Sequence, residues 1–460
     1  MSITNTPTEQ ILGIINSQRA HFRSGKTLDL NRRIDALKRL KTAILKHEKS
    51  LAEALWIDLH KSYEEAYLTE ISIVLGEIDN HIRHLKRWAK PVRKATPLKM
   101  FPSRSKVISE PLGVALIIAP WNYPVQLLLN PLVGAISAGC TAVLKPSPYV
   151  PHVSRVLEEL IADSFDSDYI AVVQGNREVN AVLLEQRYDV IFFTGSPDLG
   201  RKVMSAAAKF LTPVVLELGG KSPCIVDRGA DIAIAARRIA WGKSLNAGQT
   251  CIAPDYLLVH QSVKEQLVEA LKREFKHLLG DNPRECQHFV HIVSERAFDR
   301  LTGYLRGAEI VAGGDHDRAS RYIAPTIIDN VDPASPIMQE EIFGPIFPIV
   351  TFTTTDEAIA FVNDREKPLA LYYFGDSASA KRVLRNTSSG GACVNDTIMH
   401  IVNENLPFGG VGNSGMSSYH GIESFKVFSH TRAVVTTPTW LDLPFRYMPY
   451  KLFKFVKRIL

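Results

Sequence analysis

The segment VALIIAP, residues 114–120, is the first of five short apolar runs that decide the fold. The other four are TAVLKP (141–146), IAVVQG (170–175), VIFFTG (190–195) and PVVLELG (213–219). Each has the length of a strand, and the segments between them, 125–138, 151–163, 176–186 and 199–209, are long enough for helices. Nearly continuous apolar strands that alternate with helices predict an α/β fold with a Rossmann-like parallel sheet, covered on both faces.

The regions on either side of these strands have other patterns. Apolar residues recur at helical spacing through the first hundred residues, which predicts helices with one buried face. The basic, proline-rich segment 90–106 has no such period, so we expect it to leave the core. Strand-like SPCIVD (222–227) and YLLVH (256–260), with helix-like 231–244 and 262–278, predict a second α/β region over roughly 220–400.

The composition excludes several classes of protein. Lys and Arg number 54 and Asp and Glu 48 among 460 residues, so the net charge of +6 is too weak to indicate nucleic-acid binding. Five scattered cysteines without a C-x-x-C pair favour a reducing compartment, and we expect a cytoplasmic protein. No stretch reaches 18 uncharged apolar residues, so none is predicted to cross a membrane.

The C-terminal tail, WLDLPFRYMPYKLFKFVKRIL (440–460), ends in alternating basic and apolar side chains. Packing of this tail on the protein itself or on a partner subunit is the favoured interpretation. A basic amphipathic helix at a membrane surface is the alternative.

Three residues combine into a candidate catalytic site. Cys251 ends NAGQTC in a glycine-containing loop, where a thiol is accessible enough to act as a nucleophile. Glu217 lies at the end of an apolar strand, where burial raises a carboxyl pKa and suits a general base; pairing with Lys221 is the alternative. Asn122 directly follows a strand, and its amide can stabilise an oxyanion or, alternatively, form a local turn.

Ligands of open parallel sheets bind beyond the carboxyl ends of the strands. Lys145 and the Gly195–Ser196 pair lie at such ends, and Gly195 and Gly200 open a helix that suits a phosphate group. The G-x-G-x-x-G pattern is not present, so this signal is weak on its own. Cys286, His288 and His291 lie close together, but no second ligand pair follows them, and we predict no metal site.

In a series of short motifs, the sequence resembles the NAD(P)-dependent aldehyde dehydrogenases. The shared motifs occur in the family's order over nearly the whole chain. They are PWNYP (120–124), VLKPSP (143–148), FTGS (193–196), LELGGKSP (216–223), NAGQTC (246–251), EEIFGP (340–345) and PFGGVGNSG (407–415). The short N-terminus, CIAPDY after the cysteine and PFGGVGNSGMSSYHG resemble the class 3 branch, which includes fatty and aromatic aldehyde dehydrogenases.

The resemblance implies a role for each matched residue. Cys251 matches the nucleophile that forms a thiohemiacetal and then a thioester, Asn122 the oxyanion donor, and Glu217 the base that activates water. The matched cofactor-binding residues are Trp121, Lys145, Gly195, Ser196, Gly219, Glu341 and Phe343.

The resemblance also implies an architecture and a partner. The expected parts are a cofactor-binding domain over 1–88 and 109–217, a catalytic domain over 218–405, and a bridging or oligomerisation element. This last part comprises 89–108 and 406–460 with the C-terminal tail. Class 3 relatives are typically homodimers, and their substrates suggest medium-to-long aliphatic or aromatic aldehydes.

One departure from the family pattern bears on the cofactor. Many relatives have a glutamate three residues after the lysine, where this sequence has Pro148. A carboxylate at such a position binds the ribose 2′-hydroxyl and repels a 2′-phosphate. We therefore expect NADP to be accepted as well as NAD.

Two other functions compete with hydrolytic aldehyde oxidation. A CoA-acylating enzyme would release the acyl group to a thiol, but such relatives commonly lack the glutamate matched by Glu217. A catalytically silent binding protein on the same fold would be expected to lose Cys251 or a cofactor contact, and this sequence retains them.

Overall fold

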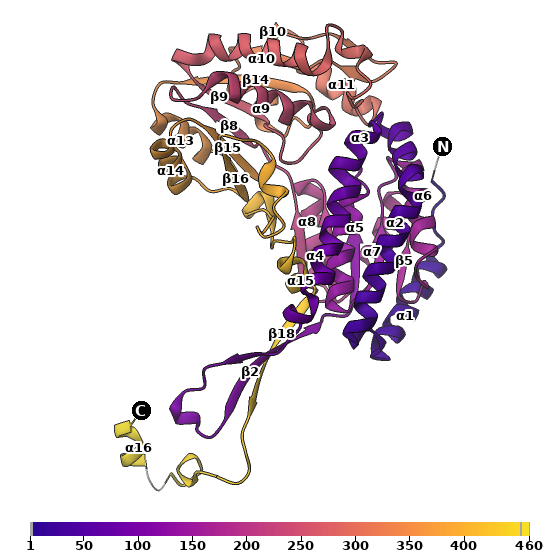
Figure 1. The fold of residues 1–460 in the computed structure, drawn as a ribbon, viewed down its shortest axis with the longest axis vertical. Helices are drawn as coiled ribbons and strands as arrows, with labels where there is room; N and C mark the ends of the chain where they lie inside the picture. Colours follow the sequence, from indigo (N-terminus) through magenta and orange to yellow (C-terminus); the bar gives the residue numbers. More distant parts are fainter. Residues whose placement is uncertain (1–2, 451–452, 460) are drawn as a thin grey trace.

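The computed structural model of the protein describes residues 3–450 and 453–459. It has two mainly parallel sheets, each with helices packed on it, and an antiparallel arm that extends away from both (Figure 1). The predicted α/β fold is confirmed.

The first sheet contains all five strands predicted from the apolar runs. In spatial order its strands are β17 (Gly415–Met416), β7 (Val214–Glu217), β6 (Val190–Thr194), β3 (Val114–Ile118), β4 (Thr141–Lys145) and β5 (Ile170–Val172). All pairs are parallel except β17 with β7. The connecting helices are α5 (Gln126–Ala138), α6 (Pro151–Ala162), α7 (Arg177–Leu184) and α8 (Pro197–Ala208). Strands β3, β4 and β6 are buried along their whole length, as a sheet covered on both faces requires.

N-terminal helices add a further layer to this sheet. They are α1 (Thr8–Arg23), α2 (Leu30–Leu59), α3 (Tyr63–Ala66) and α4 (Ser72–Trp88), with one π-helical turn at Tyr67–Ile71. Leu37, Leu40 and Ile44 of α2 are fully buried, so the apolar stripe predicted from the sequence faces the core. Helix α2 packs against α6, α4 and α5.

The second sheet is formed by the later part of the chain. Its strands, in spatial order, are β10 (Glu309–Ala312), β13 (Thr326–Asp329), β14 (Ile346–Phe352), β9 (Tyr256–His260), β8 (Pro223–Val226), β15 (Ala370–Phe374) and β16 (Gly391–Val394). Only β10 is antiparallel to its neighbour. The helices of this region are α9 (Ile232–Ser244), α10 (Lys264–Leu279), α11 (Glu295–Gly303), α12 (Pro336–Gln339), α13 (Thr355–Asn363) and α14 (Ser377–Asn386). A separate hairpin pairs β11 (His316–Asp317) with β12 (Tyr322–Ile323).

The arm is a three-stranded antiparallel sheet of β1 (Val92–Lys94), β2 (Arg104–Pro111) and β18 (Ser429–Thr436). The proline-rich segment therefore leaves the core as expected, and β18 pairs with β2 along its full length. Most of its side chains are exposed. Within the range 406–460 that we assigned to the bridging element, β17 joins the first sheet and α15 (Ile422–Val427) packs on α5. The domain bounds stay a prediction.

The C-terminal tail follows the arm. Helix α16 (Phe453–Ile459) lies at its far end (Figure 1), whereas Lys451, Leu452 and Leu460 lie outside the described residues. Among the helices that the structure describes, none is long and apolar enough to span a membrane.

Candidate active site

The predicted site residues converge on one cavity at the carboxyl ends of β3, β6 and β7. This inner cavity has a volume of about 210 Å³. Its lining includes every predicted site residue except Lys145, namely Trp121, Asn122, Gly195, Ser196, Glu217, Gly219, Cys251, Glu341 and Phe343. Residues from segments more than 200 positions apart in the sequence thus share one space.

The loop that carries Cys251 has an unusual backbone. Asn246 and Ala247 both have a φ of 50°, in the left-handed region that non-glycine residues rarely adopt. Gly248, with a φ of 70°, approaches the backbone of Gly344 so closely that an added Cβ would lie 2.4 Å from its oxygen. Strain of this kind persists only where the surroundings enforce it, and here it lies in the turn directly before Cys251, which lines the cavity.

Burial raises the pKa of the Cys251 thiol, and the nearby Glu341 and Glu217 carboxyl groups raise it further. Backbone amides of Cys251 and Ile252 oppose this effect only in part. Cys251 is therefore a neutral thiol in the ligand-free site at pH 7 and becomes nucleophilic only on losing its proton.

The Asn122 side chain points toward the cysteine loop. Its Nδ2 donates to the carbonyl oxygen of Gln249 at 3.1 Å, and Asn246 Nδ2 donates to the same oxygen at 2.9 Å. An amide NH2 group has two hydrogens, so Asn122 carries a second donor for a ligand. The amide is thus held against the loop of Cys251, two residues from the thiol.

Glu217 ends β7 and is 2% exposed. Neither of its carboxylate oxygens has a hydrogen-bond partner among the described residues. Burial raises its pKa well above the usual range. The alternative of a pair with Lys221 is wrong, because Lys221 Nζ contacts Asp255 at 2.5 Å and the carbonyl oxygens of Ile337 and Glu340.

Glu341 reaches the same cavity from the segment after α12. Burial and the negative charge of Asp255 raise its pKa to about 8, and its Oε1 has no partner among the described residues. A Cβ on Gly219 would lie 2.2 Å from Glu341 Oε2, so a larger residue at this position would displace the Glu341 carboxyl group. Trp121 and Phe343 meet edge to face across the cavity, with ring centroids 5.4 Å apart.

These groups fit a dinucleotide. Ser196 is the N-cap of α8, whose N-terminus opens on the cavity and suits a pyrophosphate. The unpartnered Glu341 carboxylate suits a ribose hydroxyl. Lys145 lies outside the inner cavity at the end of β4, where burial lowers its pKa to about 8 and its Nζ donates to the Pro146 carbonyl at 2.7 Å.

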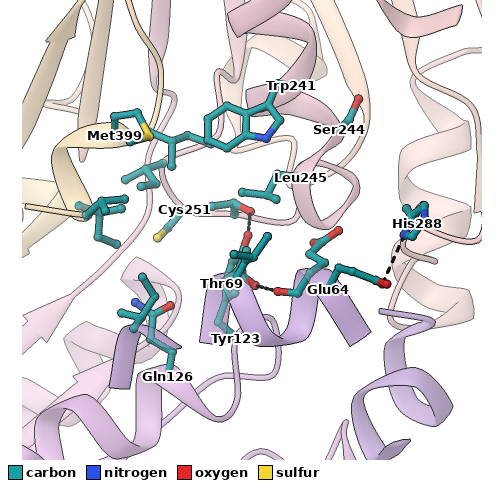
Figure 2. Close-up of a pocket in the computed structure, with 18 of the residues that line it drawn as sticks. Glu64, Thr69, Tyr123, Gln126, Trp241, Ser244, Leu245, Cys251, His288 and Met399 are labelled. Atoms are coloured by element: carbon teal, nitrogen blue, oxygen red, sulfur yellow. Dashed lines mark hydrogen bonds and ion pairs between the residues drawn. The ribbon is translucent and has the colours of Figure 1, made fainter. Parts of the chain in front are cut away.

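A second pocket meets the inner cavity at Cys251. This outer pocket has a volume of about 470 Å³. Cys251 points into it, with Trp241 and Met399 on one side and Tyr123 and Gln126 on the other (Figure 2). Its remaining lining is mostly apolar and includes Leu68, Ile73, Leu127, Leu245, Ile252, Leu278, Ile398, Ile401, Val402 and Phe408.

The sequence analysis missed these lining residues. They come from distant helices and loops and carry no local signal, since an apolar residue that lines a pocket has the same type as one in the core. Some lie in or beside quoted motifs, as Tyr123 does in PWNYP, Phe408 in PFGGVGNSG, and Leu245 and Ile252 beside NAGQTC, but the motifs did not indicate an aldehyde pocket.

His288 and His291, two of the three residues that we rejected as metal ligands, each lie beside another side chain. His291 stacks on His60 with ring centroids 4.0 Å apart, and His288 Nδ1 lies 3.7 Å from Glu64. Among the residues that the structure describes, no group of three or more His, Cys, Asp or Glu side chains is arranged to hold a metal ion.

Comparisons with known proteins agree with this geometry. The family model described as "Aldehyde dehydrogenase family" matches residues 1–434. The chain is 47% identical to 4,4'-diaponeurosporen-aldehyde dehydrogenase of Staphylococcus aureus, covering 95% of this chain and 96% of that protein. It is 46% identical to the dimeric NADP-preferring aldehyde dehydrogenase of Canis lupus familiaris, covering 96% and 98%.

Other relatives place the chain within the family. It is 48% identical to aldehyde dehydrogenase family 3 member A2 of Mus musculus over 90% of this chain and 86% of that protein. The solved structure described as the substrate-bound state of Staphylococcus aureus AldH superposes with a TM-score of 0.96 at 46% identity, covering 98% and 99%. The chain belongs to the aldehyde dehydrogenase family, near its family 3 members, and is an NAD(P)-dependent enzyme that oxidises aldehydes.

Proposed function

We propose that the enzyme oxidises apolar aldehydes to carboxylic acids through a covalent intermediate on Cys251. The observation that carries this proposal is that Cys251 lines both cavities, with Glu217 and Asn122 beside it in the inner one. A thiol at the junction of an apolar pocket and the cavity lined by the proposed cofactor contacts can meet the aldehyde from one side and the hydride acceptor from the other.

The Cys251 thiol first gives its proton to solvent water. Addition of the resulting thiolate to the aldehyde carbon forms a C–S bond and leaves the electron pair of the C=O π bond on oxygen. The second N–H of the Asn122 amide and the backbone N–H of Cys251 donate to this oxyanion. NAD(P), when bound, supplies the acceptor for the hydride that leaves the same carbon. Cys251 then carries the acyl group as a thioester.

Release of the acid is assigned to Glu217. Its carboxylate takes a proton from water, the water oxygen adds to the thioester carbonyl, and the C–S bond breaks to return the Cys251 thiolate. Unpartnered oxygens suit this role, because they are free to accept a water proton. The raised pKa makes the Glu217 carboxylate a stronger base than an exposed glutamate.

The cofactor contacts follow from the inner cavity. Trp121, Gly195, Ser196, Gly219, Glu341 and Phe343 are proposed to hold the pyrophosphate and nicotinamide end, and Lys145 the adenosine ribose. Pro148 offers no carboxylate to repel a 2′-phosphate, and mammalian relatives carry the name NADP-preferring. We therefore propose that NADP is accepted and favoured.

The outer pocket supports medium-to-long aliphatic or aromatic aldehydes as substrates. Its lining is mostly apolar, and burial of each methylene group stabilises a bound chain by about 0.8 kcal/mol. A short polar aldehyde would leave most of this pocket unfilled.

The assembly and location are also proposed. The exposed arm of β1, β2 and β18, together with relatives named as dimeric, supports a homodimer in which 89–108 and 406–460 bridge the subunits. The first sheet would form the cofactor-binding domain (1–88 and 109–217) and the second the catalytic domain (218–405). Five free cysteines support a reducing, cytoplasmic location.

The test is the formation of reduced cofactor from a series of aliphatic and aromatic aldehydes without CoA. NAD and NADP are supplied separately, and Cys251→Ala is compared with Cys286→Ala as a matched thiol control. Turnover that is lost only in Cys251→Ala supports the proposal. Turnover that appears only when CoA is added would instead show an acylating enzyme, and absence of turnover under both conditions would contradict catalysis.

A further inference from the structure

A buried ion pair lies directly behind the Asn122 loop. Lys61 Nζ contacts Glu70 Oε1 at 2.6 Å, and both side chains are fully buried. Two charges removed from water lose hydration free energy that their mutual attraction only partly returns, so such a pair is weak support for fold stability. Its position therefore needs another explanation.

Both members of the pair bind the backbone of the loop between β3 and α5. Lys61 Nζ donates to the carbonyl oxygen of Asn122 at 3.2 Å and lies 4.3 Å from the centre of the Tyr123 ring. Glu70 Oε2 accepts from the backbone N–H of Val125 at 2.8 Å and of Gln126 at 3.4 Å. The pair thus holds the loop at Asn122 and again where α5 begins.

The loop needs this support because its sequence, PWNYP, provides little of its own. Pro120 and Pro124 have no N–H to donate, and the loop lies between the strand and the helix, where its Tyr123 carbonyl oxygen accepts from the backbone N–H of Leu127 at 2.9 Å. Besides Lys61, the Asn122 carbonyl oxygen accepts from Asn246 Nδ2 at 3.1 Å, which joins the loop to the turn before Cys251.

The local helix geometry directs Glu70 toward this loop. Glu70 lies in the π-helical turn Tyr67–Ile71 that separates α3 from α4. A π turn takes one more residue than an α turn, so it rotates the following side chains relative to a regular helix, and such turns are frequent at functional sites.

We propose that Lys61 and Glu70 are positioning residues for aldehyde oxidation, which fix the backbone of Asn122 so that its amide is aligned with the oxyanion. This inference rests on the proposed role of Asn122. Neither side chain lines the inner cavity, so both act through Asn122 and not on the substrate.

The test is a double-mutant cycle with decanal as substrate and NADP as cofactor. Lys61→Met keeps the length of the side chain and removes its charge and donors. Lys61→Met is measured alone and in the Asn122→Ala background. It is also combined with Glu70→Gln, which removes the second charge of the pair. This combined variant leaves no unpaired buried charge and serves as the test if Lys61→Met alone does not fold. Lys264→Met, which breaks a partly buried pair with Asp329 at 2.6 Å on the second sheet, is the matched control.

We expect Lys61→Met to lower kcat/KM by about 10²-fold, the effect of a misplacement near 1 Å. We expect no further loss when it is added to Asn122→Ala, and an unchanged Kd for NADP measured by tryptophan fluorescence. Lys264→Met should retain the native kcat/KM. The rate of Cys251 alkylation should be the same in Lys61→Met as in the native enzyme, because the thiol itself is not displaced.

Three results would overturn the positioning role. Losses that multiply in the double variant would show a structural effect independent of Asn122. Native activity of Lys61→Met, or of Lys61→Met with Glu70→Gln, beside an impaired Asn122→Ala would refute positioning while leaving the proposed function intact. Native activity of Asn122→Ala would refute the oxyanion role itself, and the positioning role with it.

Discussion

The substitution Glu217→Gln should separate the two halves of the proposed reaction, which are acylation of Cys251 and release of the acid. Glu217→Gln keeps the size of the side chain but removes the group that takes a proton from water. General-base catalysis contributes about 10² to 10⁴ in rate, equivalent to about 2.7–5.4 kcal/mol, so we expect steady-state turnover to fall by this factor. Since acyl transfer to Cys251 does not use this base, one equivalent of reduced cofactor should still form rapidly.

The structure indicates that this substitution is tolerated. Glu217 has no hydrogen-bond partner among the described residues, and burial raises its pKa, so ionisation of this group does not stabilise the fold. Glutamine has the same shape and the exchange removes no hydrogen bond, so the melting temperature should stay near that of the native enzyme.

Stopped-flow absorbance of the reduced cofactor is the assay. The expected trace is a burst equal to the concentration of active sites, followed by slow turnover. Glu274→Gln is the control, because Glu274 also has a buried oxygen without a hydrogen-bond partner but lies on α10 outside both cavities. A burst that disappears together with turnover would refute the assignment to acyl release, and unchanged turnover would refute a base role altogether.

Four other changes test the site. Gly219→Ala should displace Glu341 and raise the Kd of the cofactor about tenfold, by analogy with a lost charged hydrogen bond; isothermal titration with an unchanged Kd would contradict the contact. The rate of Cys251 alkylation by iodoacetamide, after subtraction of the rate for Cys251→Ala, should rise about tenfold per pH unit from pH 7 to 9. Burial raises the pKa of this thiol, so it stays mostly protonated over this range while its thiolate fraction grows with pH. A plateau of the rate near pH 8 would contradict the raised pKa. Met399→Lys should reduce kcat/KM for decanal at least about tenfold and leave propanal nearly unaffected, since only the longer chain fills the outer pocket; equal losses for both would argue against the pocket. Glu341→Gln should raise the melting temperature more at pH 9 than at pH 5, because the buried carboxyl group has to be ionised at pH 9 and glutamine stays neutral. Differential scanning calorimetry at the two pH values measures both shifts. Equal shifts would refute the raised pKa of Glu341.

The predicted elements of the fold were those with a strong local pattern. Strands such as β3 and β6 are continuous apolar runs, and the structure places them in the centre of the first sheet. Strand β17 was missed because it has only two residues and exists through its pairing with β7, almost 200 positions earlier. The arm was predicted as an excursion, but its partner strand β18 was not, since pairing over such a separation leaves no periodic signal.

The site divides in the same way. Motif residues such as Glu217 and Glu341 were found because short patterns of the family carry them, and the structure brings them into one cavity. Lys61 and Glu70 were missed because charged residues in a helical region are normally exposed. Their position behind Asn122 follows only from the tertiary structure. The outer pocket around Trp241 is likewise formed by tertiary packing.

The stability cost of this site follows from its ionisable groups. Glu341 has a pKa of about 8 in the folded protein, against about 4.3 for an unfolded glutamate. Between these pH values the folded state binds more protons than the unfolded state, so stability falls as the pH rises through this window. Burial also raises the pKa of Glu217, so its ionisation destabilises the folded state in the same way.

In the ligand-free site, ionisation of either carboxyl group also makes it harder for Cys251 to lose its proton. Acylation removes that thiol as a titrating group, and with it the charge that would oppose the Glu217 carboxylate. In the proposed mechanism, the negative charge of the reacting side chains therefore lies first on Cys251 and then on Glu217, and their mutual repulsion disfavours both charges at once.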